Sequence, residues 1–418
     1  MLGAFTLQTT RGATLHSPMH MVTDETSVRY AGWRIVVVCF FVATFGWGLG
    51  FYGQSVYLAE LQRAHGWPAS LISAGTTFFY LFGALVVAFV AEVVRAFGPR
   101  ACLVAGLLAL AAAAVAMGHA REPWQLYAAD ALLAFGWAGT SLAMITNTLS
   151  LWFDKRRGMA ISLALNGASF GGIVGVPLLV VAIGSVGFSL AMTAAAVAIV
   201  VVMVPLVLVA VGSPPHHLNA PTARAAPSSV EIRARALRDI GFLSIAIAFA
   251  LALFAQVGFI VHLISFLDPV IGRHAAAIAM AALTAMAVVG RVLFSTVIDK
   301  LNQRPAAALS FLSQAVALII VIHSTNAVVL VAACALFGFS VGNLITLPSL
   351  IVQREFDSKS FGVLISLVTA INQVTYSFGP GVVGLLWDWS GSYALPFYGC
   401  MALQVIAAAL ILLRGRRL

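Results

Sequence analysis

The chain has 418 residues, of which 61% are hydrophobic and only 9% are charged, and its mean hydropathy is +1.01. Soluble globular proteins carry about 25% charged residues, so this composition excludes a soluble protein of this size. The net charge is +9, but the basic residues lie in short loops between apolar runs, which indicates a membrane-orienting role and no nucleic-acid partner. The runs far exceed the alternating segments of about ten residues found in membrane β-barrels, so the sequence predicts an all-α membrane protein.

Apolar runs long enough to cross a membrane recur along the whole chain. A crossing helix needs about 20 predominantly apolar residues. Runs bounded by charges and turn residues lie at 33–58, 69–94, 100–119, 124–150, 158–182, 187–211, 240–266, 274–298, 305–323, 325–352, 361–386 and 393–413. The sequence therefore predicts twelve transmembrane helices.

The longest break between these runs divides them into two sets of six. It is rich in proline and arginine, which is typical of an extended linker. We expect a cytoplasmic N-terminal segment at 1–32, an N-terminal six-helix bundle at 33–211, a cytoplasmic linker at 212–239, a C-terminal six-helix bundle at 240–413 and a cytoplasmic tail at 414–418.

The basic residues indicate how the chain is oriented. With the N-terminus in the cytoplasm, every Lys and Arg falls on the cytoplasmic side except Arg63, Arg121 and Arg273, which fall opposite, and Arg291, which falls inside a span. Loops rich in Lys and Arg remain in the cytoplasm. We expect a multi-pass protein of the plasma or bacterial inner membrane with both termini cytoplasmic.

The two halves carry a weak internal repeat. Gly158–Leu163 (GMAISL) resembles Gly362–Leu367 (GVLISL), and each segment opens a helix just after a charged loop. The same offset aligns the loop 95–100 with the loop 299–304. Parallel repeats of six helices, with a binding site near the membrane midplane, occur in secondary transporters. The repeat predicts two pseudo-symmetric six-helix bundles with a site between them.

The repeated loops carry a family resemblance. Residues 299–304 (DKLNQR) resemble the signature G-x-x-x-D-[RK]-x-G-x-[RK]-[RK] of the major facilitator superfamily, with Ser295 and Asn302 in place of its two glycines. The first-half copy departs from the signature, because Arg95 stands where the family has aspartate. With its twelve spans and central basic loop, the chain is similar to this superfamily over most of its length. The resemblance implies gating roles for the cytoplasmic-loop residues Arg95, Arg100, Asp154, Arg156, Asp299, Lys300 and Arg304.

A second segment narrows the resemblance. Trp152–Ala160 (WFDKRRGMA), followed by Gly167 and Gly171, is similar to the loop between spans 4 and 5 of monocarboxylate transporters and oxalate/formate antiporters. Arg291 stands where that group carries an arginine in span 8. The resemblance implies transport of small carboxylates.

Arg291 is the first candidate for substrate binding. It lies about 12 Å from the cytoplasmic end of its span, at a rise of about 1.5 Å per residue. An arginine facing lipid at that depth costs at least about 2.5–3.5 kcal/mol, which favours a hydrated cavity or an anionic partner. A guanidinium binds carboxylate through two parallel hydrogen bonds. The alternative is an arginine that reaches the cytoplasmic interface or pairs with a neighbouring helix.

Two other titratable residues lie within predicted spans. Asp130 is the only acid well inside an apolar run, and a buried acid is a candidate proton site. It could equally accept structural hydrogen bonds near the outer interface. His262 lies in span 7, where proton coupling, substrate binding and simple packing are all open.

Further polar side chains within the spans can line a substrate path or join helices by hydrogen bonds. Together with Arg291 and His262, we take as candidate substrate-binding residues Tyr52, Asn147, Asn343, Asn372 and Tyr376.

These observations favour a secondary active transporter, and no catalytic constellation, cofactor motif or metal-binding spacing argues for an enzyme. The expected cargo is a small organic anion, and a monocarboxylate in particular, moved with protons or against a counter-anion by a monomer in a lipid bilayer. Two alternatives stay open. One is an efflux transporter for drugs or other amphipathic compounds, and the other is a membrane receptor that has this fold but transports nothing.

Overall fold

The structure is a computed structural model that describes residues 25, 27, 30–212, 229–297, 301–357 and 360–413. Within these residues all regular structure is helical, and twelve helical stretches are long and apolar enough to cross a membrane. The predicted fold class is thereby confirmed, and the chain is a multi-pass membrane protein.

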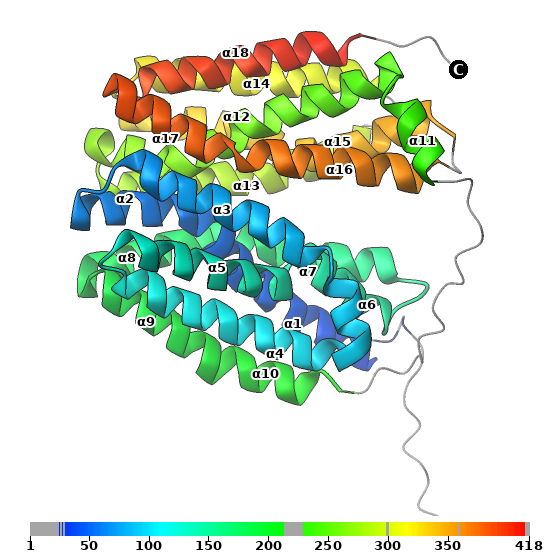
Figure 1. The fold of residues 1–418 in the computed structure, drawn as a ribbon, viewed down its shortest axis with the longest axis horizontal. Helices are drawn as coiled ribbons and strands as arrows, with labels where there is room; N and C mark the ends of the chain where they lie inside the picture. The colour runs from blue at the N-terminus through cyan, green and yellow to red at the C-terminus, as the bar shows by residue number, and fades with distance from the viewer. Residues whose placement is uncertain are drawn as a thin grey trace, which may run out of the picture.

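The first six spans form one bundle, drawn from blue to green in the lower part of Figure 1. Several spans consist of more than one helical element. α1, η1 and α2 are continuous, as are α7, η2 and α8, and also α9, η3 and α10. α5 and α6 belong to one span but are separated by Ser141, whose backbone is extended. The elements are α1 (Ala31–Phe45), η1 (Gly46–Tyr52), α2 (Gly53–His65), α3 (Ala69–Val87), α4 (Val90–His119), α5 (Pro123–Thr140), α6 (Leu142–Ser150), α7 (Arg157–Phe170), η2 (Gly171–Gly175), α8 (Val176–Val186), α9 (Phe188–Ala198), η3 (Ile199–Met203) and α10 (Val204–Ala210).

The last six spans form the second bundle, in the upper part of Figure 1. A short helix within the expected linker, α11, precedes them, and α16 continues into α17. The elements are α11 (Ser229–Ala236), α12 (Ile240–Ile271), α13 (Arg273–Val297), α14 (Gln303–His323), α15 (Ala327–Glu355), α16 (Phe361–Ser377), α17 (Gly379–Ser390) and α18 (Ala394–Ile411).

The spans alternate in direction, so the protein has two ends. We call the end that carries the start of α1, the end of α10 and α11 the linker end, on the right of Figure 1, and the opposite end the distal end. Tight turns at the distal end contain glycines with positive φ, where other residues are strained: Gly66, Gly187, Gly272 and Gly391.

Several span boundaries differ from the sequence prediction. The second span ends at Val87 and not at 94, the third begins at Val90 and not at 100, and the seventh extends to Ile271 and not to 266. The first span continues beyond residue 58 to His65, with Glu60 and Arg63 inside the helix. The break expected at residues 184–185 lies instead at Gly187, whose φ of 84° ends α8. Hydropathy did not locate these ends, because α2 continues through the charged residues Glu60 and Arg63, and the backbone angle at Gly187 ends α8.

Glycines bring the helices of each bundle into backbone contact. A Cβ atom on Gly167 of α7 would lie 1.9 Å from the carbonyl oxygen of Phe40 on α1. In the other bundle a Cβ on Gly290 of α13 would lie 1.8 Å from the carbonyl oxygen of Phe339 on α15. Small residues allow such close approach where lipid supplies no hydrophobic drive between helices. The packing places α1 beside α7 and α13 beside α15, and this positions the side chains described next.

Candidate functional site

Arg291 lies on α13, half-buried, where this helix packs against α15 of its own bundle and η2 and α8 of the other. Its side chain rests on Gly342 of α15, since a Cβ there would lie 3.2 Å from the Arg291 Nε. That Nε is buried and has no hydrogen-bond partner among the described residues. A buried donor without a partner is costly, so this guanidinium is suited to an incoming acceptor.

The face of α13 that carries Arg291 meets the N-terminal bundle at Thr284, two turns earlier along the helix. A Cβ on Gly172 of η2 would lie 2.4 Å from the Thr284 Cγ2 and 3.0 Å from the Tyr52 Cδ2 of η1. The charge of Arg291 also reaches Tyr52. Arg291 therefore lies on the helix that meets the other bundle, two turns from the contact of Thr284 with Gly172.

Both N-terminal contributors come from π-helical segments. Tyr52 ends η1, and Gly172 lies in η2. Such wide turns leave some backbone groups poorly paired and are often found at functional sites. Glycines permit them here, because a Cβ on Gly171 would lie 2.8 Å from the backbone nitrogen of Gly48.

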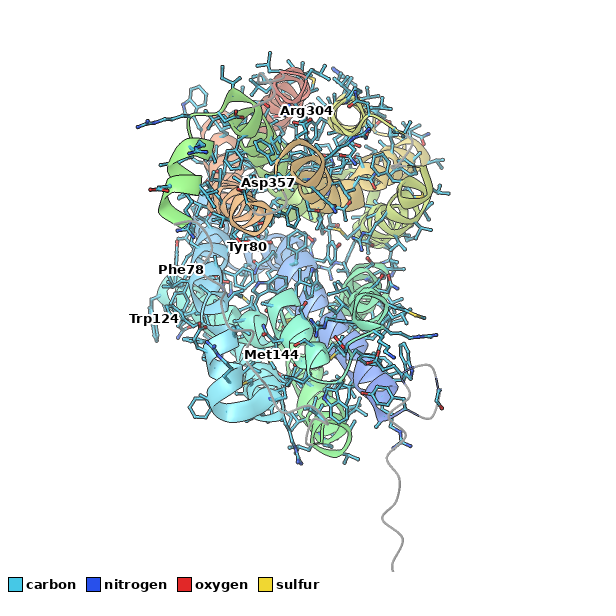
Figure 2. All side chains as sticks on the ribbon, turned by 90° about the vertical axis from the view of Figure 1, so that its right-hand side faces the viewer. Phe78, Tyr80, Trp124, Met144, Arg304 and Asp357 are labelled. Carbon is cyan, nitrogen blue, oxygen red and sulfur yellow. The ribbon has the colours of Figure 1, made fainter. Side chains whose placement is uncertain are left out.

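Aromatic rings continue the contact between the bundles. The rings of Tyr80 on α3 and Tyr376 on α16 meet edge to face with centroids 5.8 Å apart. Phe51 bridges Tyr52 and Tyr80, with centroid separations of 5.1 Å and 6.0 Å. The buried Tyr80 hydroxyl has no partner among the described residues, and Figure 2, viewed from the linker end, shows Tyr80 at the boundary between the bundles. Sequence reasoning did not single out Phe51, because an aromatic residue in an apolar run gives no signal of its own, and it counted Tyr80 among the polar residues of the spans but not among the candidate site residues.

Two asparagines of the C-terminal bundle also have unused hydrogen-bonding capacity. Asn343 follows Gly342 on α15, and Asn372 lies one turn before Tyr376 on α16. Both are buried, and the Oδ1 of each has no partner among the described residues. By contrast, Asn147 donates to the Ala143 carbonyl oxygen of its own helix at 2.8 Å, and no described contact joins it to the others.

A cluster of four charged residues joins the bundles at the distal end. Arg63 of α2 pairs with Glu60 at 2.7 Å on its own helix and with Asp268 of α12 in the other bundle. Arg273 of α13 pairs with Glu60 at 2.8 Å. We call these four residues the distal ion-pair cluster. Sequence reasoning placed Arg63 and Arg273 on the side opposite the cytoplasm but predicted no pairing, because only the fold brings positions about 200 residues apart into contact.

Asp388 of α17 makes a second distal contact between the bundles. Its carboxylate accepts hydrogen bonds from the backbone nitrogens of Ala69 at 3.1 Å and Ser70 at 2.8 Å, so it caps the first turn of α3. An acidic group at a helix N-terminus is stabilised by unpaired N–H groups and by the helix dipole.

His262 on α12 is completely buried near the same end, among three helices. Its Nε2 lies 3.1 Å from the Ser73 Oγ and 3.1 Å from the Pro380 carbonyl oxygen, and its Nδ1 lies 3.2 Å from the Tyr393 hydroxyl. Both ring nitrogens are therefore engaged by the protein, which makes His262 part of the distal contact between α3 and α17.

The contacts between the bundles are unevenly distributed. Among the described residues, every hydrogen bond and ion pair that joins one bundle to the other involves residues 60–73 on one side and residues 262–273 or 388 on the other, all in the distal half. These polar contacts join the two bundles at the distal end.

The described residues among those expected to act as gates lie at the linker end, and their described contacts stay within one bundle. Arg95 pairs with Glu92 at 3.3 Å, and Asp154 lies 3.9 Å from Arg157. The backbone nitrogens of Asp154 and Arg156 donate to the Glu25 carboxylate at 2.8 Å and 2.7 Å. Arg100 is exposed, and Asp299 and Lys300 lie outside the described residues.

Arg304 is the exception in being almost fully buried, as its position within the upper bundle in Figure 2 illustrates. Its Nε and Nη2 both donate to the Glu355 carboxylate at 2.8 Å. Its Nη1 donates to the Ser244 hydroxyl at 2.8 Å and to the Ile411 carbonyl oxygen at 2.7 Å. Arg304 therefore ties α12, α14, α15 and α18 together at the linker end of the C-terminal bundle.

Comparison with known proteins agrees with this architecture. The sequence model of the Major Facilitator Superfamily matches residues 36–380. The chain belongs to the Major Facilitator Superfamily. Members of this superfamily that resemble it include MFS-type transporter pynF from Aspergillus niger, which is 26% identical over 83% of this chain and 77% of the relative. MFS-type transporter 1 from Ophiocordyceps sp. is 26% identical over 81% of this chain and 74% of the relative.

Solved structures show the same fold. The nucleoside transporter NupG superposes with a TM-score of 0.74, at 12% identity, covering 91% of this chain and 98% of that one. A bacterial homologue of the human lysosomal transporter Spinster, in an inward-facing and occupied conformation, superposes with a TM-score of 0.72 at 15% identity, covering 90% and 95%. The family and fold are those of transporters, and the monocarboxylate subgroup implied by the sequence is not among these similarities.

Proposed function

We propose that this superfamily member is a secondary active transporter for a small organic anion, and that a monocarboxylate fits its site best. The observation that carries the proposal is Arg291, a permanent positive charge at the contact between the bundles with a buried Nε that no described residue engages. A carboxylate accepts two parallel hydrogen bonds from a guanidinium, which gives both affinity and orientation.

The surroundings of Arg291 support a cargo that is small and partly apolar. Tyr52 lies within range of its charge, and Phe51 and Tyr80 continue the wall toward Tyr376. Unused amide oxygens on Asn343 and Asn372 can accept hydrogen bonds from hydroxyl groups on the cargo. A short carboxylic acid with an apolar body satisfies the charge, the hydrogen-bonding groups and the rings together.

Transport would follow from rocking of the two bundles about this site. The linker end is taken as cytoplasmic, because the basic loops gather there. Separation of the distal ion-pair cluster, with closure of the linker end, would give the opposite state. The protein would act as a monomer in the lipid bilayer, with protons or a counter-anion as the second transported species.

An efflux transporter for amphipathic compounds is the second candidate, and the aromatic wall of Phe51, Tyr80 and Tyr376 favours it. The two functions differ in what Arg291 contributes, because an amphipathic cation gains nothing from a guanidinium.

A substrate panel tests the proposal. Purified protein is reconstituted into liposomes that contain one unlabelled compound. Uptake of labelled acetate, lactate, oxalate, benzoate, uridine or tetraphenylphosphonium in exchange for it is then measured. We expect saturable exchange of one or more carboxylates. Exchange confined to uridine or tetraphenylphosphonium would contradict the proposal, and in the second case it would support amphipathic efflux.

A further inference from the structure

We propose that Asp130 binds the proton that drives transport, and that α3 transmits its protonation state to the contact between the bundles. This inference rests on the transport function proposed above and names its coupling site. The sequence alone left Asp130 open between a proton site and a structural hydrogen-bond acceptor.

The surroundings of Asp130 favour the first reading. Its side chain, on α5, is 1% exposed, and neither carboxylate oxygen has a hydrogen-bond partner among the described residues. A structural acceptor would have donors within reach. Removing an unpaired ionised carboxylate from water costs several kcal/mol, so this packing holds the neutral acid. Ionisation requires water to reach it and therefore requires movement.

Gly75 on α3 closes the space around the acid. A Cβ on Gly75 would lie 2.4 Å from the Asp130 Oδ2, so this oxygen meets bare helix backbone. The titratable side chains that interact electrostatically with Asp130 are all tyrosines: Tyr57 of α2, Tyr80 of α3 and Tyr127 of α5 itself. No described Lys, Arg or His acts on its carboxyl, and α4, α6 and η1, which also pack against α5, supply no charge there.

The opposite face of α3 makes the distal contact with the other bundle. Ser73 and Thr77 stand two residues either side of Gly75, about 200° around the helix. A Cβ on Gly384 of α17 would lie 2.7 Å from the Ser73 Oγ, and one on Gly381 would lie 2.9 Å from the Thr77 Oγ1. Helix α3 therefore lies between Asp130 and α17. It can pack closely against both only while Asp130 is neutral, because an ionised carboxylate needs water at its surface.

This arrangement couples a proton to distal closure. With the distal end open, water reaches Asp130, and its carboxylate takes up a proton to give the neutral acid. Helix α3 then returns against α5 and α17, and the distal contacts form. Release of the proton favours the conformation in which the distal end is open. His262 is less suited to the role, because Ser73, Pro380 and Tyr393 already engage its two nitrogens.

The first test measures coupling in liposomes with Asp130→Asn, which fixes a neutral side chain of nearly the same shape. Wild type is expected to accumulate labelled lactate, acetate or benzoate in response to an inward proton gradient, and its exchange rate is expected to depend on pH. Asp130→Asn is expected to lose gradient-driven accumulation, and its remaining exchange is expected to lose its pH dependence. Glu122→Gln, which removes an exposed acid at the start of the same helix, is the matched control and should behave as wild type.

The second test needs no substrate. Spin labels at Arg121 and Ser392, exposed residues at the distal end of the two bundles, report the distance across that end. In the wild type, raising the pH is expected to shift the distance distribution toward longer values, whereas Asp130→Asn is expected to stay short at every pH.

The outcomes separate the two proposals. Gradient-driven accumulation that survives Asp130→Asn, or a distance distribution in the variant that still follows pH, overturns the role of Asp130. Absence of carboxylate exchange in the wild type contradicts the proposed function, and the distance measurement then decides the role of Asp130 by itself.

Discussion

At the scale of single residues, the two ionisable side chains Arg291 and Asp130 have similar surroundings. Arg291 in one bundle rests on Gly342, and Asp130 in the other rests on Gly75. Each has buried polar atoms that no described residue engages. Structural ion pairs within a bundle look different, as Arg304 shows, with hydrogen bonds to a carboxylate, a hydroxyl and backbone carbonyls. Unused hydrogen-bonding capacity therefore separates Arg291 and Asp130 from Arg304.

The geometry of the guanidinium predicts the effect of a conservative change. Arg291→Lys keeps the charge but cannot donate two parallel hydrogen bonds, and one hydrogen bond to a charged group is worth about 1.5–3 kcal/mol, so carboxylate affinity should fall on the order of tenfold or more. The substrate concentration for half-maximal exchange reports the carboxylate affinity. Arg34→Lys, at an exposed position near the linker end, is the control. An equal effect of both changes would contradict a role of Arg291 in binding the carboxylate.

The buried charge of Arg304 predicts a loss of stability without a direct effect on binding. Glu355→Ala leaves this buried guanidinium without its partly exposed carboxylate, and a hydrogen bond to a charged group is worth about 1.5–3 kcal/mol. Thermal unfolding in detergent should therefore occur at a clearly lower temperature. Arg354→Ala removes the neighbouring side chain, whose bond to Leu301 is exposed, and should change the unfolding temperature little.

At the scale of elements, glycines decide which helices pack together. Gly167→Ala on α7 would place a methyl group 1.9 Å from the Phe40 carbonyl oxygen, and overpacking of this kind costs about 1–3 kcal/mol. Gly184→Ala on α8 has nothing within 4 Å and should be neutral or slightly stabilising, by up to about 1 kcal/mol, because alanine favours helix. Thermal unfolding of the two variants compares them directly. Equal stability would contradict the close packing of α1 on α7.

The elements also show what the sequence could predict. Length and hydropathy predicted the spans, because a membrane demands about 20 apolar residues whatever the tertiary structure. Positions 291 and 130 were recognised because charge in lipid is costly. The π-helical turns and Phe51 were not recognised, because their roles arise from pairings between helices that hydropathy does not encode.

At the scale of the whole molecule, the two ends of the bundle differ. The distal end is joined by the ion-pair cluster, by the Asp388 cap on α3 and by the His262 contacts. Partly exposed ion pairs contribute only about 0–1 kcal/mol each, so such contacts can form and separate during a transport cycle. In this conformation the distal contacts are formed, and a transport cycle requires them to separate.

The cluster predicts how that state can be shifted. Glu60→Gln combined with Asp268→Asn leaves Arg63 and Arg273 without acidic partners and facing one another's charge. The distal end should open, which spin-label distances across it would record as longer values. Glu92→Gln, which removes an exposed acid at the linker end, should leave those distances unchanged. A double variant that stays closed would show that other contacts hold the distal end.

The central claim is that Arg291 holds an anionic cargo between the bundles. The most direct measurement is exchange of labelled lactate, acetate, oxalate and benzoate in liposomes by the wild type, Arg291→Gln and Arg34→Gln, with folding of each variant checked by thermal unfolding. The account predicts saturable exchange by the wild type and Arg34→Gln, and its loss in a folded Arg291→Gln. Carboxylate exchange that persists in Arg291→Gln would contradict it.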